Sequence, residues 1–176
     1  MKRIAFVLIA IAVLSTAAMA GDMAKSGSWG IQTAIGVASS PVLSASNVGV
    51  KFMASENLAI RVEVGFVTIS PPGGGGSTSG YQVGAGFEYH MESKGGSVSP
   101  YVGLQAGYGG GSLPGGGTTP NSFAVNGVWG GEYFFSSNFS WGGEVGIGFL
   151  STGASGNTTS AFGTTSATMI ATWYLN

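Results

Sequence analysis

The most constraining feature of this sequence is a strict two-residue alternation at residues 58–66, Leu-Ala-Ile-Arg-Val-Glu-Val-Gly-Phe. Large apolar side chains occupy every second position, and Arg61, Glu63 and two small residues occupy the positions between them. Successive side chains of a β-strand point to opposite faces, so this segment predicts a strand with one apolar and one polar face. A helix would place both charged residues in the same arc as their apolar neighbours.

The same alternation recurs along the chain and predicts eight strands, each about as long as a tilted strand that crosses a bilayer. They cover residues 29–37, 47–54, 58–69, 81–91, 101–109, 122–135, 139–150 and 165–175. Short connections follow the second, fourth and sixth strands. Longer connections cover residues 38–46, 70–80, 110–121 and 151–164. Short turns on one rim and longer loops on the other are typical of an up-and-down transmembrane barrel.

The scarcity of charge indicates which way the apolar faces point. Only 7% of the residues are charged and 33 are glycine, whereas about 25% of a soluble domain is charged. The glycines and nearly all strand charges share the polar parity, and the interior of an eight-stranded barrel is just wide enough for side chains. In water, an apolar outer face of this size would be a very large exposed hydrophobic patch. In a lipid bilayer, an apolar outer face is what the environment requires. The sequence therefore predicts an all-β, eight-stranded antiparallel transmembrane β-barrel, whereas a soluble barrel would place its apolar face inside.

Aromatic residues near the ends of the expected strands support this placement. Examples are Trp29, Tyr89 and Trp173 near the short-turn rim, and Tyr81 and Tyr108 near the long-loop rim. Amphipathic rings are enriched where a membrane protein meets the headgroups, so the pattern predicts two aromatic girdles.

The first twenty residues have the three parts of an export signal. A basic pair, Lys2-Arg3, precedes an apolar run at residues 4–14, and Ala-Met-Ala at residues 18–20 is a small-x-small cleavage site. The apolar run is short for a membrane anchor, which favours cleavage. We therefore expect a Sec-type signal peptide at residues 1–20 and a single barrel domain at residues 21–176. No basic patch of the kind that binds nucleic acid is present, so no nucleic-acid partner is expected.

Ionisable side chains on the polar parity are expected inside the barrel, because Arg or Lys facing lipid near the midplane costs about 2–4 kcal/mol. They are Lys51, Arg61, Glu63, Glu88, His90, Glu132 and Glu144. Symmetric hairpin pairing predicts that Lys51 lies opposite Arg61 and that Arg61 lies opposite Glu88. Unpaired buried charges are costly, so we predict an interior ion-pair network toward the periplasmic half that plugs the lumen.

The expected network contains more acid than base. Four glutamates face one lysine and one arginine, so the excess is balanced by protonation, by hydration or by pairing with His90. Two functions are open for such a cluster: static filling of the lumen, or a gate that opens a small ion path when pairs exchange.

Taken together, the signal peptide, the eight alternating strands, the short turns on one rim and the glycine-rich polar parity resemble small OmpA/OmpX-type outer-membrane barrels. The resemblance implies a monomer in the bacterial outer membrane, in contact with outer-membrane lipid. It also implies recognition of the C-terminal strand by the outer-membrane assembly machinery. Members of this family usually end on an aromatic residue, but this chain ends on Asn176, which leaves Trp173, Tyr174 and Leu175 for that recognition. Because the chain stops at the eighth strand, no peptidoglycan-binding domain is expected.

The function expected from this reading is a structural or surface-interaction role with a plugged lumen. A small low-conductance porin gated by the interior ion pairs is the alternative. The longer connections contain no charged residue, which argues against an electrostatically steered receptor site there.

A lipid-modifying outer-membrane enzyme is the second alternative. Such enzymes need a His and usually a Ser partnered with a carboxylate. The single histidine, His90, lies in His-Met-Glu-Ser, which lacks a His-x-Ser spacing, and it points inward near the periplasmic end. No catalytic residue is therefore predicted. His90 and Glu88, two residues apart on a strand, are a weak metal signal, so no metal and no cofactor are predicted.

Overall fold

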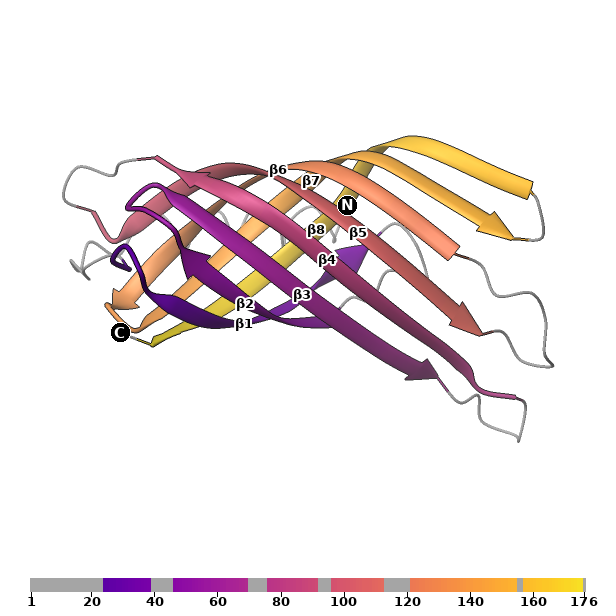
Figure 1. Cartoon of the computed structure of the whole chain (residues 1–176), viewed down its shortest axis with the longest axis horizontal. Coiled ribbons are helices and arrows are strands. Elements are labelled where there is room, and N and C mark those ends of the chain that lie inside the picture. Colours follow the sequence, from indigo (N-terminus) through magenta and orange to yellow (C-terminus); the bar gives the residue numbers. More distant parts are fainter. Residues whose placement is uncertain are drawn as a thin grey trace, which may run out of the picture.

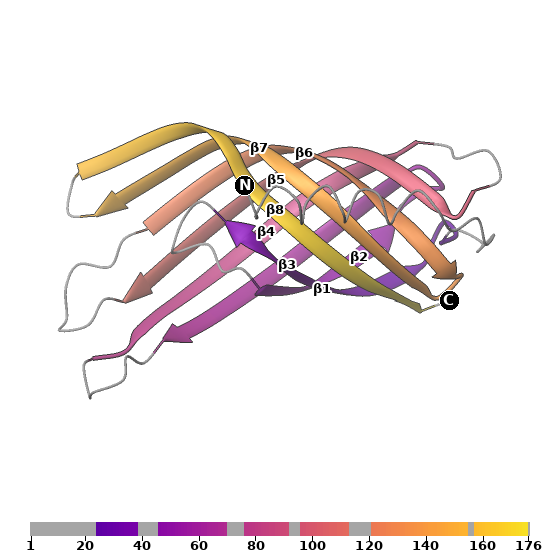
Figure 2. The same ribbon diagram turned by 180° about the vertical axis from the view of Figure 1, so that it is seen from behind.

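The computed structural model is a closed barrel of eight antiparallel strands, and it describes residues 24–38, 46–69, 76–91, 96–112, 121–154 and 157–175. The strands are β1 (Trp29–Ala38), β2 (Ser46–Met53), β3 (Leu58–Ile69), β4 (Thr78–His90), β5 (Val98–Ser112), β6 (Asn121–Ser136), β7 (Phe139–Ala154) and β8 (Asn157–Leu175). Each strand pairs with the next, and β8 returns to pair with β1 (Figures 1 and 2). The predicted fold class is confirmed. Among the described residues, no helix has the length and apolar character needed to cross a membrane.

The apolar parity faces outward and the polar parity faces the lumen. On β3, Val62 is 53% exposed and Phe66 is 81% exposed, whereas Arg61, directly before Val62, is only 2% exposed. The same alternation of exposed and buried residues runs through β6, where Phe123 and Val125 are exposed and Asn126 is buried. The predicted orientation is confirmed, because the buried side chains of the strands are mostly the polar and small ones on the inward parity, apart from the first six residues of β8, which are exposed.

The connection expected at residues 151–164 is the main error in the predicted strand boundaries. Pairing between β7 and β8 continues past Ser151↔Ser160 to Ala154↔Asn157, so these residues form a hairpin (Figure 1). The hairpin is rich in serine and threonine, and threonine favours strands without adding an apolar face. The alternation of apolar residues therefore does not reveal these strand extensions, although the backbone pairing continues through them. A register shift between Gly146 and Ile147 marks the start of this extension.

The other long connections fall largely outside the described residues. The described strands nevertheless shorten them, since β4 already begins at Thr78 and β5 runs on to Ser112. The expected signal peptide at residues 1–20 also lies outside the described residues.

The register of the β2–β3 hairpin was predicted correctly, but that of β3–β4 was not. Lys51 pairs with Arg61 as expected. Arg61 pairs with Gly86 rather than Glu88, and Glu88 pairs with Ala59. A shift of two residues keeps every side chain on its own face, so the alternation pattern cannot detect it. The connection between these strands has turn-forming residues at several successive positions, Pro71, Pro72 and the glycines at 73–76, so its sequence does not single out one turn centre.

An apolar cluster fills the lumen at the short-turn end of the barrel. Its members are Ala24, Met53, Ala59, Phe134 and Tyr174. The Phe134 and Tyr174 rings stack with their centroids 5.7 Å apart. The segment before β1 closes over this end through a 2.7 Å hydrogen bond from the Gly27 amide to the Met53 carbonyl. Gly27 has a φ of +87°, a conformation that favours glycine.

Candidate functional site

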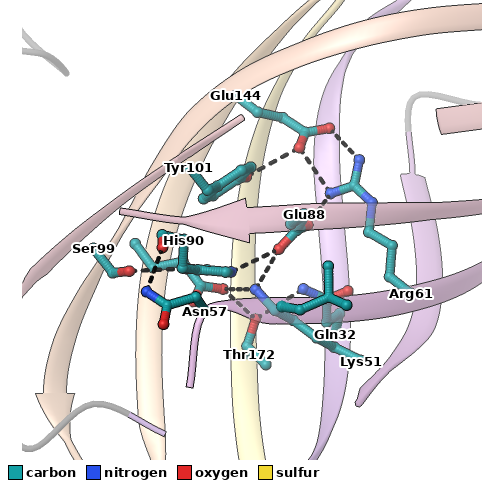
Figure 3. Close-up of polar contacts among 12 residues, drawn as sticks. Gln32, Lys51, Asn57, Arg61, Glu88, His90, Ser99, Tyr101, Glu144 and Thr172 are labelled. Carbon is teal, nitrogen blue, oxygen red and sulfur yellow. Dashed lines mark hydrogen bonds and ion pairs between the residues drawn. The ribbon is translucent and has the colours of Figure 1, made fainter. Parts of the chain in front are cut away.

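The centre of the lumen holds one connected network of ion pairs (Figure 3). Lys51 on β2 is fully buried, and its Nζ lies 2.6 Å from Glu88 Oε2 and 2.9 Å from Glu132 Oε1. The ammonium group also lies 5.4 Å from the centroid of the Tyr101 ring. Tyr174 Oη donates a 3.0 Å hydrogen bond to the other oxygen of Glu132. The Lys51 charge is thus neutralised by carboxylates from two other strands, β4 and β6.

Arg61 on β3 forms the second cationic centre. Its guanidinium makes a bidentate pair with Glu144 at 2.7 and 2.8 Å, and Nη1 also donates to Glu88 Oε1 at 2.9 Å. Its Nε lies 3.3 Å from Glu63 Oε1. Arg61 and Lys51 are directly opposed across the β2–β3 ladder, a costly arrangement for like charges. Glu88 offsets this cost because one of its oxygens contacts each cation.

Small and aromatic residues shape the space for these side chains. Tyr101 on β5 donates a 3.0 Å hydrogen bond from Oη to Glu144 Oε2. Its ring lies over Gly130, where an added Cβ would come within 2.6 Å of Tyr101 Cζ. The glycine at this position therefore leaves room for the tyrosine that holds Glu144 against Arg61.

His90 lies between a carboxylate and a hydroxyl group. Its Nε2 is 3.1 Å from Glu88 Oε2 and its Nδ1 is 2.8 Å from Ser99 Oγ. This is a Ser–His–Glu grouping that the local sequence around His90 did not indicate, since Ser99 comes from the next strand. Ser99 is only 2% exposed. Glu88 is also engaged by both cations, and all three side chains are buried, so the grouping forms part of the buried network.

Above the ion pairs, toward the long-loop end, the lumen is lined by amides. Glu63 accepts hydrogen bonds from Asn47 Nδ2 at 2.8 Å and Gln105 Nε2 at 2.5 Å. Gln82 Nε2 in turn donates to Asn47 Oδ1. This layer borders a cavity of about 80 Å3, whose lining also includes Asn126, Gly49 on β2, Gly84 on β4 and Gly107 on β5.

All seven residues singled out in the sequence meet in this network. Lys51, Arg61, Glu63, Glu88, Glu132 and Glu144 carry the ion pairs, and His90 joins them through Glu88. Arg61 does contact Glu88, but diagonally rather than across the predicted register.

Sequence reasoning missed the uncharged members of the network. Tyr101, Tyr174, Asn47 and Gln105 each bind a carboxylate, but only charged side chains and His90 were considered for the network. Their inward parity was the available signal: a polar side chain at an inward position needs a partner when buried. The inward position of Tyr174 has a second consequence, because it leaves Trp173 and Leu175 as the exposed residues at the end of β8.

The fold can be compared with known proteins. No protein-family profile and no curated protein matches the sequence. Among solved structures, the chain is similar to the N-terminal β-barrel domain of Pseudomonas aeruginosa OprF, with a TM-score of 0.53, 13% identity and coverage of 85% of this chain and 98% of that domain. It is also similar to the outer membrane protein OprG from the same organism, with a TM-score of 0.55, 13% identity and coverage of 86% and 97%. The chain therefore has the fold of small eight-stranded outer-membrane barrels.

Proposed function

We propose that this protein is an integral β-barrel of a bacterial outer membrane, with a structural or surface-interaction role and a lumen that does not conduct ions. The observation that carries the proposal is the division of side chains between the two faces of one closed sheet. The outer face is apolar on all eight strands, and closure pairs the backbone groups that hydrocarbon cannot solvate. Lipid is the environment that such a surface requires.

Exposed aromatic residues near both rims support this placement. Trp29, Tyr89 and Trp173 are exposed near the short-turn end, and Tyr81 and Tyr108 are exposed near the other end. Rings of this kind favour the headgroup region at each membrane interface. We further propose export by the signal peptide at residues 1–20 and assembly as a monomer in contact with outer-membrane lipid.

Two consecutive layers support a closed lumen. The apolar cluster around Phe134 and Tyr174 fills the short-turn end. The ion pairs of Lys51 and Arg61 fill the layer above it, with both cations almost completely buried. A permeating ion would have to separate bonded charges and then cross packed aromatic rings, and separating buried charges is costly.

The membrane proposal is tested by extracting the full-length protein from purified outer membranes and comparing its gel migration before and after boiling. A folded barrel migrates differently in the two samples, and N-terminal sequencing is expected to begin at Gly21. Recovery in a soluble fraction, or identical migration before and after boiling, would contradict the proposal.

The small porin is retained as a second candidate because a cavity of about 80 Å3 already occupies the lumen above the ion pairs. Planar-bilayer recordings separate the two functions. A closed barrel gives no reproducible current steps for the wild type. Steps that change in Arg61→Ala or Glu88→Gln would favour a gated pore instead.

A lipid-modifying activity is the remaining alternative, since His90 lies beside Ser99 and Glu88. Burial of all three side chains argues against it. We expect the lipid A profile of cells carrying His90→Ala to match that of cells carrying the wild type. A changed profile would identify an enzyme.

For assembly, we propose that the exposed Trp173 and Leu175 supply the outward part of the C-terminal strand that the assembly machinery recognises. Trp173→Ser is then expected to lower the amount of folded protein in the outer membrane, while the purified variant still refolds in detergent. Equal amounts of folded wild type and variant in the membrane would contradict this role.

A further inference from the structure

We propose that Asn126 and Gly127 form a self-modification site. In chains that have not folded, Asn126 is converted to aspartate or isoaspartate, and the converted chains can no longer form the barrel. These two residues are the only Asn-Gly pair in the sequence, and they lie in the middle of β6. The modification competes with folding and is independent of what the finished barrel does.

The reaction needs only the asparagine, the amide that follows it and water. The main-chain nitrogen of Gly127 attacks Cγ of Asn126, and a new N–C bond forms. The bond from Cγ to the side-chain nitrogen breaks, and that nitrogen leaves as ammonia with the proton of the Gly127 amide. Water then opens the cyclic imide at one carbonyl to give aspartate, or at the other to give isoaspartate. Glycine favours the attack, because it has no Cβ beside the nitrogen and its main chain is conformationally free.

The closed barrel prevents the attack. Asn126 and Gly127 each pair with one residue of β5 and one residue of β7. This two-sided ladder keeps the main chain extended, whereas ring closure requires the chain to turn until the Gly127 nitrogen reaches Cγ. The side chain of Asn126 is also held in place: it is only 7% exposed, and a Cβ added at Gly148 would lie 2.7 Å from its Oδ1. The reaction is therefore confined to chains in which β6 is not paired.

Aspartate at position 126 would oppose folding because it adds a carboxylate to a lumen that is already rich in acid. Asn126 lines the same cavity as Glu63 and Glu144. The two permanent cations of the described lumen, Lys51 and Arg61, are already shared among four glutamates. Asn126 Oδ1 has no hydrogen-bond partner among the described residues. A carboxylate oxygen at this point would thus be buried without a donor or a free cation, which is costly.

Isoaspartate would oppose folding for a different reason. Its main chain runs through the former side chain, so β6 would gain one carbon atom in its backbone at residue 126. The residues on either side of that atom could not both keep their pairing with β5 and β7. Backbone groups left unpaired at membrane depth have no water to bind, so they are costly. Both products of the reaction therefore block closure of the barrel.

The test compares the full-length chain in its unfolded and folded states at the same alkaline pH, temperature and time. The unfolded sample is kept in guanidinium chloride and the folded sample in detergent. Site-resolved mass spectrometry measures conversion at Asn126, and labelling by an isoaspartate methyltransferase measures isoaspartate. The fraction that refolds on dilution into detergent is read from gel migration without boiling. We expect conversion in guanidinium only, with half of the refolding lost when half of the chains are converted.

Gly127→Ala is the matched control. Gly127 is exposed on the outer face, and the nearest atom to an added Cβ there is the main-chain oxygen of Ile147 at 3.7 Å, so the barrel accepts the methyl group. The methyl group crowds the attacking nitrogen, and the variant is expected to keep its ability to refold several times longer in guanidinium. Freshly made Asn126→Asp is expected to refold to a lower fraction than the wild type.

Four results would overturn the proposal. The first is an unmodified Asn126 in guanidinium, and the second is equal conversion in the folded barrel. The third is refolding of converted chains, or of Asn126→Asp, as complete as that of the unmodified wild type. The fourth is a loss of refolding in Gly127→Ala as fast as in the wild type, which would assign the loss to another reaction.

Discussion

Replacing Arg61 by methionine tests whether the lumen network holds the barrel together. Arg61 is 2% exposed and contacts Glu63, Glu88 and Glu144. Methionine fills much of the same space but leaves these carboxylates without that cation. Removing one partner of a buried ion pair costs about 3–5 kcal/mol, which lowers the folding equilibrium constant by roughly 10²–10⁴-fold. We therefore expect Arg61→Met to be strongly destabilised.

The measurement is a urea titration of the refolded barrel in lipid vesicles, with the folded fraction read from gel migration without boiling. Glu144→Gln keeps one acceptor oxygen and removes a charge from a lumen rich in acid, so it should cost about 1–3 kcal/mol. The double variant should be more stable than the sum of the two effects predicts, with a coupling energy of about 0.5–3 kcal/mol. An Arg61→Met barrel within about 0.5 kcal/mol of the wild type, or strict additivity, would refute the reasoning.

Two further substitutions test the two faces of the wall. Gly130→Ala would place a Cβ 2.6 Å from the Tyr101 ring, so we expect a loss of about 1–3 kcal/mol from overpacking. Gly107→Ala is its control, because the nearest atom there is 3.6 Å away; equal stability of the two variants would contradict the packing argument. Val64→Arg puts a charge on the outer face near the middle of β3 and should cost about 2–4 kcal/mol in vesicles. Glu56→Arg, in an exposed turn, should cost much less, and equal costs would argue against a lipid-facing Val64.

Most of the architecture could be predicted from the sequence because one physical rule governs every strand. A narrow lumen admits small and polar groups, and the outer face accepts apolar ones, so the two-residue period is visible wherever apolar side chains are present. This rule does not predict the strand residues within 151–164. There most residues are serine, threonine or glycine, Phe162 is the one large apolar residue in this stretch of the sequence, and a single apolar residue does not establish an alternation although pairing continues.

The site was partly predictable for the same reason. The two-residue alternation predicted that all seven ionisable residues lie in the lumen. It could not predict which of their atoms are in contact. The contact between Arg61 and Glu88 depends on a diagonal reach across β3 and β4, and a two-residue error in register leaves parity unchanged. Tyr101 and Tyr174 bind carboxylates on other strands by extending across the lumen. The spacing of residues along the sequence gives no information about such contacts.

The ladder between the first and last strands constrains how the molecule can form. Trp29 pairs with Leu175, so the final seam joins the two extremes of the described chain. Until that seam closes, the growing sheet exposes two edges with unpaired amides and carbonyls, the arrangement that invites association with other chains. Contacts so distant in sequence also form slowly. An unclosed barrel is therefore prone to associate with other chains, and the pairing of β8 with β1 removes both free edges at once.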